Sequence, residues 1–517
     1  MGDNDTRMDA KRMALQDAKR LALERAGTYI ESITEVKDFG LSNDEVRAYT
    51  AGIVEVTEQE TRSMMEGQQQ VVRVEVICKI DTDVMARQID ALRKNETVKV
   101  ELLHARQEAD QLRQELETKT RELAAVTSKT EAETIAQARR KVLTGQDVNS
   151  LLARARVALF GYSETFSPGS SSSEGRRRAR SLIEQALALD VSNPDVHEMM
   201  GTLLAEEGNL EGAIASYRTA IRLKPDVAIA HSNLGLALKA KGDLEGAIAA
   251  YRTAIRLKPD LAIAHTNLGL ALQAKGDLEG AIAAHRTAIR LEPDLASAHS
   301  NLGNSLQAKG DLEGAISAYR TAIRLEPDLA SAHSNLGAAL KAKGDLESAI
   351  AAYRTAIRLK PDLAAAHTNL GIALKDKGDL EGAIAEHRTA IRLKPDYALA
   401  HTNLGVSLKD KGDLEGAIAE HRTAIRMEPD YANAHYGLGT ALQDKGDLEG
   451  AISAYRTAIR LKPDHANTHY GLGLILKVKG QRAEAAQEFR EYLRLAPDTP
   501  VHRPWIEQAR VLLRELE

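Results

Sequence analysis

The chain has 517 residues, which is longer than one hydrophobic core usually supports, so several domains or a repeat array are expected. Aromatic residues make up only 3% and the AVILMFWYC class 43%, so the buried surface must consist mainly of Ala, Leu, Ile and Val. The formal net charge of −5 gives no excess positive field for a phosphate backbone, which argues against a nucleic-acid partner.

The first 92 residues are expected to form a small α+β domain. The stretch TRMDAKRMALQDAKRLALERAG, residues 6–27, alternates charged and small apolar residues and predicts a helix. The stretches IVEVTEQ, residues 53–59, and QVVRVEVICKI, residues 70–80, alternate with period two and predict strands. The second stretch contains Cys78, the single cysteine of the chain, which excludes an intramolecular disulfide framework.

Two stretches, DAKRMALQDAKRLALERAGTYIES and EVRAYTAGIVEV, resemble a bacterial envelope domain found in small lipoproteins and at the front of flagellar assembly protein T. In that family a signal peptide and an opening strand usually precede this point, so Met1 is a candidate internal start. The compartment therefore stays open: cytoplasmic as the chain stands, or periplasmic or cell envelope if a signal peptide is missing. No apolar run in the sequence is long enough to cross a bilayer.

Residues 93–145 are expected to form a helical connector or a coiled coil. Seven apolar positions follow the 3,4 spacing of a heptad seam, with Glu, Gln, Lys and Arg around them. These positions are Leu102, Ala105, Ala109, Leu112, Leu116, Leu123 and Val126. Because Lys119 interrupts the seam, a parallel homo-oligomer through residues 102–126 and a solitary connector helix both fit the pattern.

Residues 146–193 are expected to form a degenerate helical repeat. The stretch DVNSLLARARVALFGY predicts its first helix, and RRRARSLIEQALALDVSNPD predicts its second. The stretch between them, SETFSPGSSSSEG, is too polar to pack and predicts a flexible insertion.

Nine copies of one 34-residue motif follow over residues 194–499. The copies are marked by Gly201, Gly235, Gly269, Gly303, Gly337, Gly371, Gly405, Gly439 and Gly473. In the copy that reads AHSNLGLALKAKGDLEGAIAAYRTAIRLKPDLAI, Gly242 is expected to close a first helix in the left-handed conformation and Asp243 to cap the next. Pro259 ends that second helix. Each copy is therefore a helical hairpin, and stacking of neighbours completes the core.

The motif resembles the tetratricopeptide repeat over residues 194–499. The residues that carry the resemblance are Leu234, Gly235, Ala247, Tyr251, Ala254 and Pro259 and their equivalents. The resemblance implies a mostly α fold, a right-handed α-solenoid of helical hairpins whose first helices line the concave wall. The small α+β domain and a long helix precede this solenoid.

Residues 500–517 are expected to form a C-terminal capping helix. Its apolar face consists of Trp505, Ala509, Leu512, Leu513 and Leu516. A repeat array needs a terminal element to cover its last apolar face, and this helix fits that role.

A histidine stands once in each repeat where the family often has Trp. The nine are His197, His231, His265, His299, His333, His367, His401, His435 and His469. Equivalent residues in adjacent repeats should lie about 8–10 Å apart, whereas zinc needs imidazole nitrogens at about 2.0–2.1 Å. These histidines are therefore interpreted as half-buried packing and hydrogen-bonding residues, and His285, His387 and His421 of the second helices receive the same interpretation.

No catalytic constellation stands out in the sequence. It has no Gly-rich phosphate loop, no metal-ligand cluster with short spacing and no nucleophile elbow. A reaction centre needs unlike groups that converge, whereas a repeat array offers like groups in a row. The chain is expected not to be an enzyme and to need neither a cofactor nor a metal.

Identical side chains repeated at a regular spacing suit a ligand that also repeats at a regular spacing, such as a polypeptide backbone. Six of the repeats have an asparagine two residues before the glycine that marks the copy. These residues are Asn233, Asn267, Asn301, Asn335, Asn369 and Asn403. An asparagine amide pairs with both the C=O and the N–H of a peptide unit. The six residues, called here the asparagine row, are similar to the asparagine ladder in the repeat domain of O-linked N-acetylglucosamine transferase, and predict a track for an extended peptide.

Further candidate peptide contacts flank the asparagine row. Lys239, Lys341, Lys375 and Lys409 follow it along the same helices, and Tyr436 and Tyr470 come after its last member. Those tyrosines are expected either to stop a bound segment or simply to pack. Acidic residues nearby give mixed signs, which predicts modest salt sensitivity of binding.

Two functions remain open at this point. In the first, the array is a non-catalytic scaffold that binds an extended peptide segment of a partner protein in its concave groove. In the second, the array is an architectural spacer or self-assembling rod, and the N-terminal α+β domain does the recognition, with bacterial envelope assembly as the process that its resemblance implies.

Overall fold

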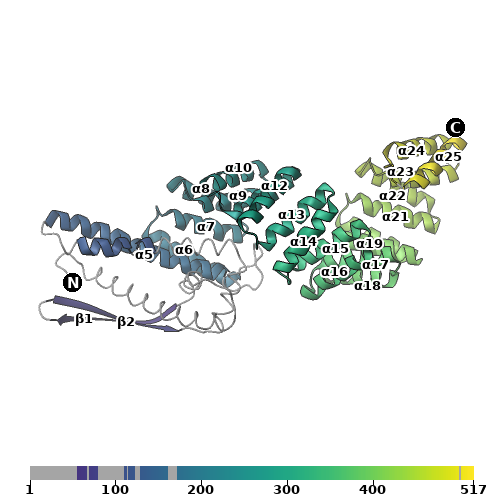
Figure 1. Cartoon of the computed structure of the whole chain (residues 1–517). Helices are drawn as coiled ribbons and strands as arrows, with labels where there is room; N and C mark the ends of the chain where they lie inside the picture. The colour runs from purple at the N-terminus through teal and green to yellow at the C-terminus, as the bar shows by residue number, and fades with distance from the viewer. Residues whose placement is uncertain are drawn as a thin grey trace. The chain divides into compact units, whose positions relative to one another are not determined.

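A computed structural model describes residues 55–66, 69–79, 110–112, 114–122, 129–160, 172–499 and 502–517 (Figure 1). The chain divides into two compact units, Met1–Pro293 and Asp294–Glu517, called here the first and second units. The fold is mostly α and is a solenoid of helical hairpins, as the sequence predicts. Within the described residues, none of the helices combines the length and the apolar character that a membrane span requires.

Two strands lie in the N-terminal segment. Strand β1 (Glu55–Glu66) pairs antiparallel with β2 (Gln69–Lys79), with Glu66 opposite Gln69 and an irregular register near Val56. Both strands overlap the segments whose alternation predicts strands. The helix expected over residues 6–27, and with it the stretches that resemble the envelope domain, fall largely outside the described residues.

Helix α5 (Lys129–Phe160) begins upstream of the boundary expected at residue 146. Gly145 lies inside this helix, and a Cβ atom there would lie 3.3 Å from Cδ1 of Leu112. Leu112, a member of the predicted seam, therefore packs on α5 of the same chain. Most other seam residues lie outside the described part.

Helix α6 (Ser173–Leu189) packs against α5 as the second helix of the degenerate repeat. Ser172 caps it, because its Oγ accepts a hydrogen bond from the backbone N–H of Gly175 at 2.9 Å. Leu152 of α5 and Ile183 of α6 are buried in one hydrophobic cluster, which continues into the next repeat through Met199.

Nine helix pairs then follow the 34-residue period. In the first unit they are α7 (Pro194–Glu206) with α8 (Leu210–Leu223), α9 (Ala228–Lys241) with α10 (Leu244–Leu257), and α11 (Ala262–Lys275) with α12 (Leu278–Leu291). In the second unit they are α13 (Ala296–Lys309) with α14 (Leu312–Leu325), α15 (Ala330–Lys343) with α16 (Leu346–Leu359), α17 (Ala364–Lys377) with α18 (Leu380–Leu393), α19 (Ala398–Lys411) with α20 (Leu414–Met427), α21 (Ala432–Lys445) with α22 (Leu448–Leu461), and α23 (Ala466–Val478) with α24 (Arg482–Leu495).

The repeat containing α9 and α10 shows how the sequence makes each hairpin. Gly242 ends α9 with φ of 92°, and Oδ1 of Asp243 accepts from the N–H of Gly246 at 2.9 Å, as predicted. A Cβ atom at Gly235 would lie 2.7 Å from the Tyr251 ring, so the two helices approach too closely there for any larger residue. The packing glycine and the buried ring are thus one interlocked contact.

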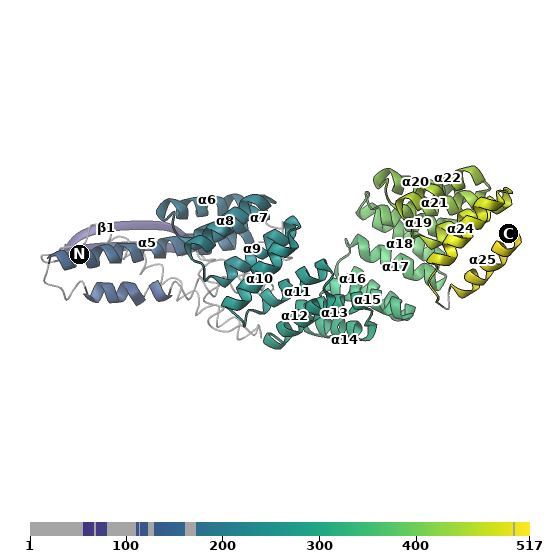
Figure 2. The same cartoon turned by 90° about the horizontal axis from the view of Figure 1, so that it is seen from above.

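The first helices of the repeats form the inner layer of each unit. Successive first helices contact one another, for example α9 with α11 in the first unit and α17 with α19 in the second. Among the described helices, successive second helices make no comparable contact. The hairpins and their order are visible from two directions (Figures 1 and 2).

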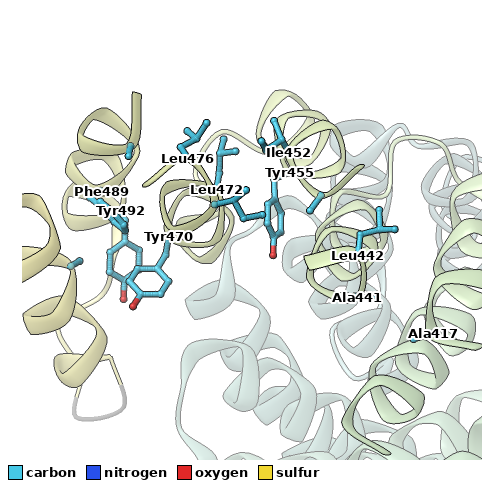
Figure 3. Packing of buried hydrophobic residues seen from close by; sticks show 14 of the residues in the cluster. Ala417, Ala441, Leu442, Ile452, Tyr455, Tyr470, Leu472, Leu476, Phe489 and Tyr492 are labelled. Carbon is cyan, nitrogen blue, oxygen red and sulfur yellow. The ribbon is translucent and has the colours of Figure 1, made fainter. Parts of the chain in front are cut away.

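Helix α25 (Arg503–Leu516) packs against α24 at the end of the array. Ala509 and Leu516 are buried in the terminal hydrophobic cluster, and Trp505 remains 51% exposed. Figure 3 shows the aromatic part of this cluster, with Tyr470 and Tyr492 side by side. The helix therefore covers part of the last apolar face.

Candidate functional site

The asparagine row lies on the first helices, from α9 to α19, one residue per helix. Asn233 is buried, with 8% of its surface exposed, and the other five are half-buried. Because the first helices form the inner layer of each unit, the row follows that layer within each unit.

Asn233 belongs to a buried polar cluster at the start of the array. Its Nδ2 donates to Oε1 of Glu198 at 2.6 Å, and Oε2 of Glu198 lies 3.8 Å from a guanidinium nitrogen of Arg156. Glu198 and Arg156 are 4% and 5% exposed. One feature of the sequence hints at this cluster: Glu198 stands where the next repeat has Ser232. Nothing near Glu198 in the sequence identifies Arg156 as the partner of Glu198.

Two members of the second unit also have partners within the chain. Nδ2 of Asn335 donates to Oδ1 of Asn304 at 3.0 Å, and Oδ1 of Asn304 also accepts from the hydroxyl of Tyr319 at 2.7 Å. Nδ2 of Asn403 donates to the carbonyl of Leu399 in its own helix at 2.9 Å. Each amide still has an oxygen and a second N–H hydrogen for another partner.

Three members of the asparagine row have side chains without hydrogen bonds in the described part of the chain. In the part of the chain that the structure describes, the side-chain amides of Asn267, Asn301 and Asn369 make no hydrogen bond. An amide can supply one acceptor and two donors, so these positions have their full pairing capacity for a ligand.

The lysines of the second unit lie near carboxylates. Nζ of Lys341 lies 3.7 Å from Asp376 of the next first helix, and Lys409 lies 3.2 Å from Asp410 and 3.6 Å from Asp444. Burial lowers the pKa of Lys409, but hydrogen bonds and charge from the two aspartates outweigh it and raise the pKa overall. Positive and negative side chains therefore alternate along the first helices of the second unit.

Lys375 and Lys239 complete the set of candidate lysines. Lys375 lies 3.4 Å from Oδ1 of Asp376, its own neighbour in the chain. Lys239 makes no ion pair within the described residues, and burial lowers its pKa. Lys239, the one candidate lysine that lies in the first unit, thus differs from the three candidates of the second unit.

The two tyrosines differ in accessibility. Tyr470 is 9% exposed, and its ring packs against those of Phe489 and Tyr492 at centroid distances of 5.9 and 5.0 Å (Figure 3). The ring of Trp505 lies 5.6 Å from that of Tyr470. Tyr436 is half-buried, with its ring 4.9 Å from that of His465. Packing is therefore the main role that the structure gives Tyr470.

The histidines of the first helices hold the connection that precedes each repeat. In eight of the nine, Nε2 lies 2.9–3.3 Å from the backbone carbonyl six residues earlier, as in His231 with Pro225. Nδ1 of His367 also lies 2.6 Å from Glu386. The hydrogen-bonding role expected of these residues is confirmed. In the described part of the chain, no group of three or more His, Cys, Asp or Glu side chains is arranged to hold a metal ion.

The histidines of the second helices differ from expectation. His285, His387 and His421 are fully buried, and neither ring nitrogen has a hydrogen-bond partner among the described residues, so the half-buried, hydrogen-bonded role expected for them is wrong. Each of these rings packs against the glycine of its first helix, in the place that a tyrosine ring takes in other repeats. His285, for example, packs against Gly269. Burial lowers the pKa of all three to about 4, with added repulsion from Lys375 at His387 and from Lys409 at His421.

Comparison with known proteins places these repeats in a family. A family model described as TPR repeat matches residues 201–242, 237–276, 272–310, 303–344, 338–378, 373–412 and 407–446. A model described as Tetratricopeptide repeat matches residues 436–500, and together the matches cover more than half of the chain. No curated protein matches the chain.

Several solved structures are similar to parts of the chain. MamA is 28% identical, covering 32% of this chain and 96% of its own, with a TM-score of 0.29. YrrB, described as a TPR protein with an unusual peptide-binding site, is 25% identical, covering 36% of this chain and 96% of its own, with a TM-score of 0.30. A tetratricopeptide repeat protein from Parabacteroides merdae is 17% identical, covering 49% and 98%, with a TM-score of 0.42.

Repeats of this family generally form non-catalytic scaffolds for protein interaction, and the partners they indicate are proteins or peptides. The sequence period, the interlocked hairpins and the family matches agree over residues 201–500. The chain belongs to the tetratricopeptide-repeat proteins and is a protein-interaction scaffold.

Proposed function

We propose that the array holds an extended segment of a partner protein along its first helices, with the asparagine row as the main contact to the segment's backbone. The observation that carries the proposal is the recurrence of one asparagine on each of four consecutive inner-layer helices of the second unit, α13 to α19. The proposal also draws on the sequence resemblance of this row to the asparagine ladder in the repeat domain of O-linked N-acetylglucosamine transferase.

The spacing of neighbouring helices supports a polypeptide as the ligand. Packed helices lie about 8–10 Å apart, and an extended chain rises roughly 3.3 Å per residue. One amide contact therefore falls at about every third residue of the segment. Four contacts suit an extended stretch of roughly eight to ten residues.

The hydrogen-bond states of the asparagines also support this use. Asn301 and Asn369 have no partner in the described part of the chain, and the contact with Asn304 leaves Asn335 an oxygen and one hydrogen. Asn233 is held by buried Glu198, so the proposal assigns it a smaller part. Recognition of the backbone would make binding tolerant of the partner's side chains.

The experiment first selects ligands and then removes the amides. Peptides enriched from a random-sequence library on the full chain are titrated against the double variant Asn335→Ala with Asn369→Ala. Loss of two amide contacts, each worth about 0.5–1.5 kcal/mol, should weaken binding by about fivefold to 150-fold. The matched control is Thr321→Ala with Thr355→Ala, because these hydroxyls bond only their own second helices.

Equal affinity of the double variant and the wild type, at unchanged helicity by circular dichroism, would remove the asparagines from the binding face. It would favour the alternative of an architectural spacer or self-assembling rod, with recognition by residues 1–92 and association through residues 102–126. Sedimentation of the full chain before and after deletion of residues 102–126 measures that association.

A further inference from the structure

Two repeats show how the second-helix tyrosine finds its hydrogen-bond partner. The hydroxyl of Tyr319 lies 3.0 Å from Oε1 of Gln307, and the hydroxyl of Tyr455 lies 2.9 Å from Oε1 of Gln443. In both cases the glutamine stands twelve residues earlier, in the last turn of the first helix. The glutamine supplies the acceptor that a buried phenol needs.

The repeat formed by α9 and α10 breaks this arrangement. Lys239 occupies the place of the glutamine, twelve residues before Tyr251. A lysine ammonium has three donors and no acceptor, so it cannot receive the phenol hydrogen. Among the described residues, the buried hydroxyl of Tyr251 has no hydrogen-bond partner, and burial raises its pKa.

The following first helix, α11, has no aspartate at the position that would face Lys239. Lys341 and Lys409 each meet an aspartate of the following first helix, Asp376 and Asp444, at 3.7 and 3.6 Å. The equivalent position after Lys239 is Ala274, which carries no charge. Within the described residues Lys239 forms no ion pair, and its half-buried side chain has a pKa lowered by burial alone.

The surroundings of Lys239 are apolar and accessible. Leu236, three residues earlier on the same face of α9, is 40% exposed. Leu270, its equivalent on α11, is half-buried. The nearby Lys241 is already paired, with Nζ 2.6 Å from Oε1 of Glu211. The site therefore offers one unpaired positive charge beside exposed leucine surface.

We propose that Lys239 binds a carboxylate of the partner segment, a single Asp or Glu side chain flanked by apolar residues, with Leu236 and Leu270 contacting those apolar residues. This inference rests on the proposed function and names the chemistry of the partner at the first unit. A single cation suits the single charge of a carboxylate better than a phosphate dianion, and α9 offers no second unpaired lysine, because Lys241, its only other lysine, is paired with Glu211.

The test compares the full chain with Lys239→Gln and the control Lys241→Gln by panning a random-sequence peptide library on each. Glutamine stands at the position of Lys239 in other repeats, as Gln307 and Gln443 do, and Lys241 forms only an exposed pair with Glu211, so both variants fit the fold. The wild type and Lys241→Gln should enrich peptides with one acidic residue between apolar ones. Lys239→Gln should lose that enrichment.

A double-mutant cycle then isolates the contact. An enriched peptide and its acid-to-amide analogue are titrated against the wild type, Lys239→Gln and the control Lys241→Gln. Loss of the acid or of the Lys239 charge alone should weaken binding about tenfold, and the two together should weaken it no further, because both remove one charge-assisted contact. Additive losses, or a loss for Lys239→Gln no larger than that for Lys241→Gln, would overturn the inference.

The outcomes separate this inference from the proposed function. Enriched peptides without an acidic preference, whose binding still needs Asn335 and Asn369, would sink the Lys239 assignment and leave the peptide track standing. An acidic preference that depends on Lys239 but not on those asparagines would support this inference alone. No enrichment of any peptide on the wild-type chain would count against both.

Discussion

The first helices of the two units share one backbone plan but differ in how their polar groups are satisfied. In the second unit, Lys341 has Asp376 nearby and Asn335 has Asn304. In the first unit, Lys239 has no such carboxylate among the residues that the structure describes, whereas Asn233 is held by buried Glu198. The repeat motif therefore determines the hairpin, while single substitutions at its variable positions determine where charge and pairing capacity remain available.

The largest difference between the units is the buried ion pair of the first. Glu198→Ala leaves Arg156 and Asn233 without this carboxylate in a buried site, and should lower the free energy of unfolding by about 3–5 kcal/mol. The control Glu211→Ala removes an exposed pair with Lys241 and should cost less than about 1 kcal/mol. Urea unfolding followed by circular dichroism measures both, and equal losses would mean that burial gives Glu198 no special role.

Acid should destabilise the second unit more than the first. The folded-state pKa of His387 and His421 is about 4, below the ordinary 6.5, so the unfolded chain takes up these protons first. Their contribution to stability is full above about pH 6.5 and falls by up to about 3 kcal/mol for each histidine as the pH drops to about 4. The first unit has His285 in the same situation. His469 of the second unit acts in the opposite direction: burial lowers its pKa, but hydrogen bonds with Glu488 and with the Pro463 carbonyl, together with the charges of Glu488 and Glu491, raise it overall.

The measurement is the urea midpoint at neutral pH and near pH 4.5 for the wild type and for His387→Tyr. Tyrosine occupies this position in neighbouring repeats, for example Tyr353, and does not titrate in this range. The variant should lose less stability on acidification than the wild type. An identical loss in both would show that His387 titrates equally in the folded and unfolded chains.

The tyrosine hydroxyls provide a finer comparison. Tyr319→Phe removes hydrogen bonds to Asn304 and Gln307 and should cost about 1 kcal/mol. Tyr251→Phe removes a buried hydroxyl that has no partner in the described part of the chain, so it should be neutral or slightly stabilising. Thermal unfolding of both variants measures the two losses of stability. A larger loss for Tyr251→Phe than for Tyr319→Phe would contradict this comparison.

The smallest expected effect concerns Lys239. Replacement by Gln offers Tyr251 the acceptor that Gln307 offers Tyr319, and relieves a partly buried charge, so stability should rise by up to about 1 kcal/mol. Lys341→Gln gives up a weak pair with Asp376 and should change stability by less than about 0.5 kcal/mol. A destabilised Lys239→Gln would indicate a partner for this lysine within the chain.

Much of the fold follows from local signals that the sequence repeats. Gly242, Asp243 and Pro259 act within a few residues of their own positions, so helix ends are predictable from the sequence. The side-chain partners are less predictable, because they depend on residues of neighbouring helices. The contact of Glu198 with Arg156, and the lack of a hydrogen-bond partner for the His285 ring within the described residues, both arise from packing that the period alone does not encode.

The central claim is that the first helices of the second unit bind the backbone of an extended segment. The most direct measurement replaces the backbone N–H of an enriched peptide by N-methyl at each residue in turn and titrates every analogue against the full chain. Affinity should fall at about every third residue, and this period should disappear in the variant Asn335→Ala with Asn369→Ala. Losses without a period, or a period that persists in the variant, would contradict the account.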